Sequence, residues 1–344
     1  MSYPLVVLGA GASFDYIDPN HNTGELNWVP PLTDDLLNFK RFKDTISKFP
    51  HVGDLFADAI RKVPSRMTLE EYLTEIKNGK ASTDRNRQIQ LNALGFYLQE
   101  LFTIISDRYG HQRVNNYNAL IGLIKDNGGE ACIVNFNYDN LLEENIESID
   151  NTIASYIAGS IKVIKLHGGC DWVSYHYSLF PIEMDSYHFL ISEPWYFTLP
   201  GITQPKLMNQ RRLLGDPYRY HNGERDALLF PAVAIPVANK EVYICPEDHL
   251  QNLHVALAKT DRILIIGWSA GDPNLIQILE QNIKKQTKVL IVTRSEESGS
   301  DIVKKLEHIK FFKFKISKTG SFTNFLKSDE ADSFFANKEV KING

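Results

Sequence analysis

Four segments of this 344-residue chain place small or polar side chains directly after a run of apolar residues. Apolar runs of this length are typical of strands that are buried on both faces of a parallel sheet. Because open α/β sheets bind ligands beyond the carboxyl ends of their strands, the four segments are candidates for one shared site. They are residues 9–13, 135–140, 167–169 and 267–273.

Asn137 and Asp139 follow the apolar run Ala131-Cys132-Ile133-Val134 and lie two positions apart. In an extended chain both side chains point to the same side, toward whatever lies beyond the strand. Each residue also has an interpretation that needs no ligand. Asn137 can bond its own backbone in a turn, and Asp139 can cap a helix that begins at Asn140.

His167 ends another apolar run and stands just before two glycines. An imidazole is the side chain best suited to accept a proton near pH 7, which makes His167 a candidate general base. A structural histidine bonded to a neighbouring carbonyl is the alternative.

Two glycine-containing turns are candidates for contact with a phosphate or a ribose. Gly9-Ala10-Gly11-Ala12-Ser13 would let the backbone approach a ligand and turn free amides toward a phosphate. This turn lacks the third glycine of a full dinucleotide fingerprint, no helix start is evident before residue 33, and a tight turn without a ligand is the alternative.

In the second turn, Asp272 and Pro273 are explained by a helix start alone. Gly267 and Ser269 are harder to explain by packing and suit a diphosphate or ribose. Arg294 ends the next strand and could reach an adenosine, or could lie in a solvated loop.

The order of periodic segments predicts an α/β fold, a Rossmann-like parallel sheet with helices on both faces and an inserted helical module. Helix signals include the capping-box spacing at Thr68 and a helix over residues 139–148. We divide the chain into 1–14, the first strand and glycine loop; 15–130, the helical module; 131–171, the core continued; 172–225, an irregular aromatic-rich segment; 226–328, the core completed; and 329–344, a tail.

The composition is that of a globular protein, with 43% apolar and 23% charged residues. A net charge of −5 argues against a general nucleic-acid-binding protein. No apolar run reaches the length of a membrane span, and no export signal is visible, so we expect a cytoplasmic protein. Three separated cysteines exclude a four-cysteine zinc site, and we expect no metal.

Read in order, the four segments resemble the sirtuin-like (Sir2-like) family, and most of all its bacterial antiphage-defence NADase branch. Residues 9–13 resemble the G-A-G-x-S opening, 135–139 the T-x-N-x-D element, 165–168 the histidine-glycine motif, and 266–273 the G-x-S-x-x-D segment. The four-cysteine zinc module of sirtuin deacetylases is absent, which puts deacylase activity in doubt.

The resemblance implies roles for individual residues. It implies that NAD is the substrate, that Asn137 positions the nicotinamide ribose and the attacking water, and that His167 is the general base. Asp139 would hold the carboxamide, and the remaining residues would contact the phosphates, ribose or adenosine. The implied binding residues are Gly9, Ala10, Gly11, Ala12, Ser13, Asp139, Gly267, Ser269 and Arg294.

The activity implied is NAD glycohydrolysis to nicotinamide and ADP-ribose, serving antiphage defence by NAD depletion. A non-catalytic NAD- or ADP-ribose-binding regulatory subunit is an alternative, and an NAD-dependent protein deacylase is another. The family also implies a homo-oligomer or a separately encoded hexameric HerA-type ATPase. The chain has no G-x-x-x-x-G-K-[ST] loop, so any ATPase would have to be another chain.

Overall fold

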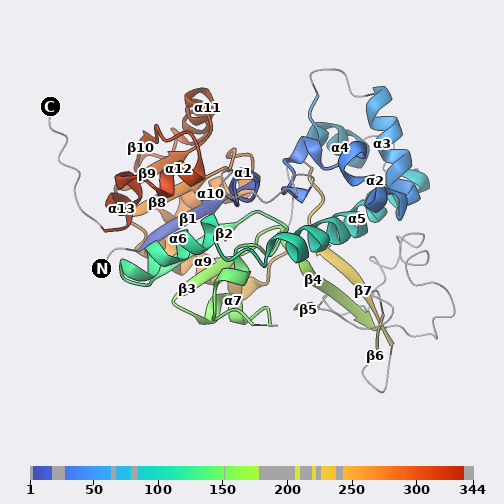
Figure 1. Cartoon of the computed structure of the whole chain (residues 1–344), viewed down its shortest axis with the longest axis horizontal. Helices are drawn as coiled ribbons and strands as arrows, with labels where there is room; N and C mark the ends of the chain where they lie inside the picture. The colour runs from blue at the N-terminus through green and yellow to red at the C-terminus, as the bar shows by residue number, and fades with distance from the viewer. Residues whose placement is uncertain are drawn as a thin grey trace.

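A six-stranded parallel sheet forms the centre of the larger part of the molecule (Figure 1). The computed structural model describes residues 3–17, 28–62, 67–78, 84–150, 152–177, 206–209, 219–221, 226–237 and 243–336. The strand order is β10-β9-β8-β1-β2-β3, and every neighbouring pair is parallel. The strands are β1 Pro4–Leu8, β2 Ala131–Asn135, β3 Ile161–Ile164, β8 Arg262–Ile266, β9 Thr287–Val292 and β10 Phe312–Ile316.

The burial of each strand follows its place in the sheet. Every residue of the central strands β1, β2 and β8 is buried, as their nearly continuous apolar sequences require when both faces are covered. The edge strand β10 instead alternates, with Lys313 and Lys315 exposed. Lysines on an edge strand discourage pairing with the edge of another chain.

The direction of the chain across the sheet reverses at β1. From β1 the chain moves to β2 and β3, whereas from β8 it moves the other way to β9 and β10. Because such crossovers are right-handed, this reversal places the connecting helices on opposite faces. One face carries α6 Asn116–Asp126 with α12 Phe322–Leu326 and α13 Asp329–Phe335, and the other carries α9 Glu247–Lys259, α10 Pro273–Asn282 and α11 Glu296–Leu306. The predicted fold class is confirmed.

The predicted helical module is present and lies to one side of the sheet (Figure 1). It comprises α2 Phe39–Ser47, α3 Pro50–Lys62, α4 Leu69–Asn78 and α5 Arg85–Tyr109. The capping box before α4 forms as expected, because Thr68 N donates to Glu71 Oε2 (2.7 Å) and Glu71 N donates to Thr68 Oγ1 (3.3 Å).

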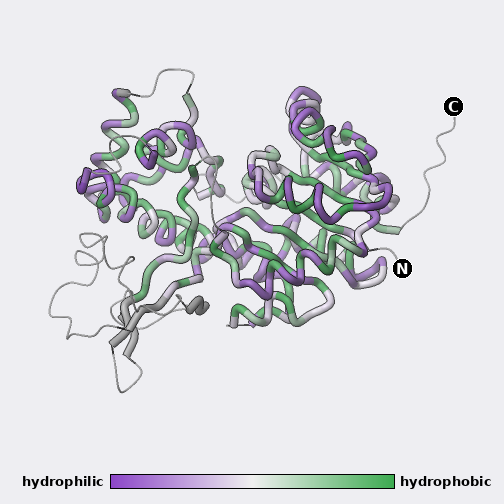
Figure 2. The backbone as a smooth tube through the Cα atoms, turned by 180° about the vertical axis from the view of Figure 1, so that it is seen from behind, coloured by the Kyte–Doolittle hydropathy of each residue, from purple (hydrophilic) through white to green (hydrophobic). Residues whose placement is uncertain are grey.

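The described residues form two hydrophobic clusters, one in the sheet region and one centred on the helical module. Figure 2 shows hydrophobic stretches inside both parts, with hydrophilic stretches along the outer helices. Within the helical module, Tyr97 Oη donates to the Leu36 carbonyl over 2.6 Å. No helix among the described residues is long and apolar enough to cross a bilayer.

A second, four-stranded antiparallel sheet extends from the core in the order β5-β4-β7-β6. Its strands are β4 Gly168–Tyr177, β5 Lys206–Asn209, β6 Arg219–His221 and β7 Asp226–Val233. Where the structure describes the segment 172–225, it is therefore strand and not irregular. The rest of that segment, including Trp195 and Tyr196, lies outside the described residues.

Several local predictions differ from the structure. A short helix, α1 Ala10–Phe14, begins immediately after Gly9, although no helix was expected before residue 33. Thr33–Asp35 is a 3-10 turn, and Asn38 provides the cap of α2. The segment assigned to a tail begins with α13, in which Ala331 and Phe335 are buried against the core.

The helix expected over residues 139–148 is reduced to a 3-10 turn, Glu143–Asn145. The Asp139 carbonyl, which the first turn of a helix would use, accepts instead from Lys165 Nζ (2.6 Å). Asn140 N donates to Ser106 Oγ (3.0 Å), and these side-chain bonds favour a turn at this position.

Candidate active site

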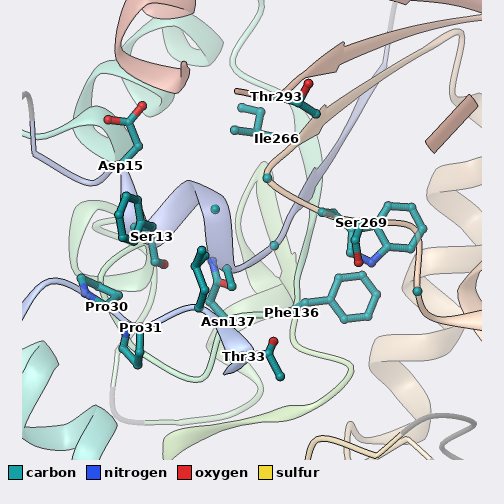
Figure 3. Close-up of a pocket in the computed structure, with 18 of the residues that line it drawn as sticks. Ser13, Asp15, Pro30, Pro31, Thr33, Phe136, Asn137, Ile266, Ser269 and Thr293 are labelled. Carbon is teal, nitrogen blue, oxygen red and sulfur yellow. The ribbon is translucent and has the colours of Figure 1, made fainter. Parts of the chain in front are cut away.

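The four candidate segments meet at one cavity beyond the carboxyl ends of the parallel strands. Its volume is about 700 Å³, within the range of about 300–1,000 Å³ typical of small-molecule sites. It lies where the chain direction reverses between β1 and β8, which is the position that ligands occupy in open α/β folds. Figure 3 shows Ser13, Asn137 and Phe136 around this space, with Pro30 and Pro31 on the side of the helical module.

His167 lines the cavity and is paired with a buried carboxylate. Its Nε2 lies 2.9 Å from Oδ2 of Asp272, and both side chains are buried. The other carboxylate oxygen, Oδ1, accepts from Tyr243 Oη (2.8 Å) and from the Leu275 amide (2.8 Å). An imidazole that gains a proton here is stabilised by a fixed carboxylate, as in His–Asp pairs of acyl-transfer enzymes.

The charge state of Asp272 follows from these contacts. Burial alone would raise the pKa of Asp272, but the hydrogen bonds from His167, Leu275 and Tyr243 outweigh it and lower that pKa below its ordinary value. Burial and the neighbouring Asp272 charge raise the pKa of Tyr243, so this phenol stays protonated and donates. Asp272 is therefore an anion at neutral pH.

Asn137 is held in the cavity wall by Tyr117. Its Nδ2 donates to Tyr117 Oη (3.1 Å), and the same phenol lies 2.8 Å from Ser13 Oγ. The phenol is fully buried, and burial raises its pKa well above the ordinary value, so it bridges the two side chains as a neutral group. The side-chain amide that bonds the backbone of this turn is that of Asn135 and not that of Asn137, because Asn135 Oδ1 accepts from Asn137 N (3.0 Å).

Asp139 reaches the cavity wall but is buried. Burial raises its pKa, and the charge of Lys165 opposes that rise. Its Oδ1 accepts from the Leu141 amide over 3.3 Å, so the side chain closes a turn and caps no α-helix.

The two glycine turns pack against each other. Gly9 N donates to the Ile266 carbonyl (3.0 Å), and Gly11 N donates to the Gly267 carbonyl (3.1 Å). A Cβ on Gly9 would lie 2.5 Å from Gly267 O, and Gly267 has a φ of +60°. These glycines are required by the close approach of two loops, and the amides of Gly9 and Gly11 are engaged within the protein.

Any phosphate bound in the cavity would therefore have to be contacted by other groups. Among the described residues that line it, the cations besides the imidazole are Arg294 and Lys305. The Arg294 guanidinium lies 5.5 Å from the centre of the Phe14 ring, and Lys305 Nζ donates to the Ser269 carbonyl (2.8 Å). Both are exposed, and the carboxylates of Asp15 and Asp301 line the same cavity.

Aromatic rings surround the imidazole of His167. Phe136 stacks on Trp268, with ring centres 5.4 Å apart and planes 4° from parallel. The same phenyl ring meets His167 edge-on at 4.8 Å. A flat aromatic ring of a ligand could pack against these surroundings.

All predicted site residues except Ala12 line this cavity, and their roles remain predictions. Sequence reasoning missed three contributors. Tyr117 looked like one apolar position of a helix, Tyr243 belongs to no motif, and Asp272 was explained as a helix cap. The N-cap role of Asp272 is real, but its second oxygen faces His167.

Comparison with known proteins gives no family model and no curated protein that matches the chain. Solved structures that are similar are Sir2 homologues. One, a complex with NAD, is 14% identical, covering 90% of this chain and 89% of that chain at a TM-score of 0.38. A mutant bound to ADP-ribose is also 14% identical, covering 90% and 92% at 0.40. A complex with a propionylated peptide is 13% identical, covering 94% and 90% at 0.41.

Proposed function

We propose that the protein is an NAD glycohydrolase that cleaves NAD into nicotinamide and ADP-ribose. The observation that carries this proposal is the single cavity in which the paired imidazole of His167, the amide of Asn137 and the two glycine turns meet. Arg294 and Lys305 could contact the phosphates, the aromatic rings beside His167 could contact the nicotinamide, and the cavity is large enough for a small-molecule ligand.

The proposed reaction is hydrolysis of the bond between the nicotinamide and its ribose. The oxygen of a water attacks the anomeric carbon of the nicotinamide ribose, and the glycosidic bond breaks with its electron pair moving to the nicotinamide nitrogen. Asn137 orients the ribose and the water, and His167 accepts the proton that the water loses. Asp272 stabilises the resulting imidazolium. Proton transfer of this kind contributes about 10²–10⁴-fold in rate.

The test follows free nicotinamide during incubation of the purified protein with NAD, in wild type and in His167→Ala. Release by the wild type and its loss in the variant would support the proposal. NAD or ADP-ribose binding without release would favour the regulatory alternative, and lysine deacylation of an acyl-peptide would favour a deacylase. A His167→Ala variant that cleaves NAD at the wild-type rate would refute the assigned role.

We further propose that this activity serves antiphage defence in the cytoplasm and is held inactive by assembly. The resemblance of residues 135–139 to the defence branch supports this role. A homo-oligomer or a hexameric HerA-type ATPase from another chain would supply the control. Nicotinamide release should then depend on protein concentration or on the added ATPase, which light scattering and the same assay would reveal.

A further inference from the structure

A buried ionic cluster lies directly behind the loop that carries Asn137. At its centre is Lys165, which follows strand β3 and is fully buried. Its Nζ lies 3.0 Å from Glu143 Oε1 and donates to the Asp139 carbonyl over 2.6 Å. Asp171 is a further buried carboxylate close enough to influence this ammonium.

The cluster is connected to the candidate site by a continuous series of hydrogen bonds. Glu143 Oε1, which meets the ammonium, also accepts from Asn135 Nδ2 (3.2 Å). Asn135 Oδ1 in turn accepts from the Asn137 amide (3.0 Å). Lys165 is also only two residues before His167, so its side chain ties the segment of the imidazole to the segment of Asn137.

Burying the charged groups of this cluster costs free energy. Burial lowers the pKa of a lysine, but Glu143, Asp171 and Asp139 outweigh it and raise the pKa of Lys165, which therefore stays protonated. Burial raises the pKa of Glu143. Replacing a buried ion pair with apolar residues is often neutral or stabilising, so stability alone is a poor reason for this cluster.

We propose that Lys165 is a positioning residue for NAD cleavage: through the Asp139 carbonyl, Glu143 and Asn135 it fixes the Asn137 loop against His167. The proposal rests on the proposed function. A misplacement of about 1 Å at a reacting centre can cost about 10²-fold in rate. The turns that follow β1 and β8 are joined to each other by their own backbone bonds, from Gly9 N to the Ile266 carbonyl and from Gly11 N to the Gly267 carbonyl, and neither bond passes through Lys165.

The decisive variant is the double substitution Lys165→Met with Glu143→Gln. It removes the ammonium and one carboxylate together, so the formal charge of the cluster matches that of the wild type. We expect kcat to fall at least about 100-fold with the KM for NAD within about threefold. The control is Lys162→Met on strand β3, just before Lys165. Lys162 Nζ donates to Asn252 Oδ1 (2.6 Å) outside the cavity, so this variant should keep wild-type kcat.

A double variant that keeps wild-type kcat would overturn the proposal. If the double variant fails to fold, Asn135→Ala tests the same series of bonds without changing charge. It should lower kcat with little change in KM, and wild-type kcat in that variant would overturn the proposal too.

Amide hydrogen exchange separates this proposal from the proposed function. Residues 137–141 should lose protection in the double variant or in Asn135→Ala, and keep it in Lys162→Met, whether or not the wild type releases nicotinamide. Absence of release by the wild type would refute only the glycohydrolase. Unchanged protection of this loop would refute the positioning role.

Discussion

The charge on Asp272 can be removed while its structural role is kept. Asn is as good an N-cap as Asp, so Asp272→Asn should retain the bond to the Leu275 amide and the start of α10. What is lost is the carboxylate 2.9 Å from His167 Nε2. The substitution therefore isolates the electrostatic support of the imidazole from the fold.

The magnitude follows from the geometry. Hydrogen bonds to charged groups contribute about 1.5–3 kcal/mol, and this one is buried on both sides. Since about 1.36 kcal/mol corresponds to tenfold in rate, kcat should fall about 10- to 150-fold. A larger loss is expected if the Asn amide, facing Nε2, forces the imidazole into the wrong tautomer.

The assay is nicotinamide release over a range of NAD concentrations, together with a thermal melt. Asp84→Asn is the matched control, because Asp84 caps α5 by accepting from Asn86 N and lies outside the cavity. The control should keep wild-type kcat. Wild-type kcat in Asp272→Asn, with an unchanged melting temperature, would refute the claim that the Asp272 carboxylate stabilises the protonated imidazole of His167.

Three further predictions concern the cavity and the loops beside it. Asn137→Ala should lower kcat about 100-fold through misplaced reactants, while the exposed Asn118→Ala should not; an equal loss in both would contradict the role of Asn137. Gly267→Ala should lower the free energy of unfolding in urea by at least about 1–3 kcal/mol, because its φ is +60° and its Cβ would lie 2.4 Å from Ala12 N. The lowered pKa of Asp272 means that the unfolded state binds more protons in acid, so stability should fall with pH below about 3.8; Asp272→Asn should show less of this loss in acid melts.

The convergence of the four polar segments could be predicted from the sequence alone. Buried apolar runs predict parallel strands, and parallel strands in alternation with helices put their carboxyl ends at one edge. The role of the glycines could not be predicted, because it depends on β1 and β8 being neighbours. That pairing gives Gly9 and Gly267 their close contact and takes up amides expected to face a phosphate.

Hydrogen bonds between side chains on distant segments also could not be predicted from the sequence. His167 and Asp272 belong to separate strand ends, and either residue alone has a sufficient local explanation. Tyr117 sits on α6 at a position that periodicity assigns to the core, which it also occupies. Local patterns identify which residues are buried, but only the fold shows which of them share a hydrogen bond.

The position of β1 also has a consequence for biosynthesis. Leu5 pairs with Cys132 on one side and with Ile263 on the other, so β1 has both neighbours only after residues far along the chain have been synthesised. Pairings this remote in sequence are slow to form. A nascent or prematurely terminated polypeptide would lack the β8 wall and the carboxylate at position 272, and so would lack the assembled cavity. The cavity could form only after β8 and the residues that follow it have been synthesised.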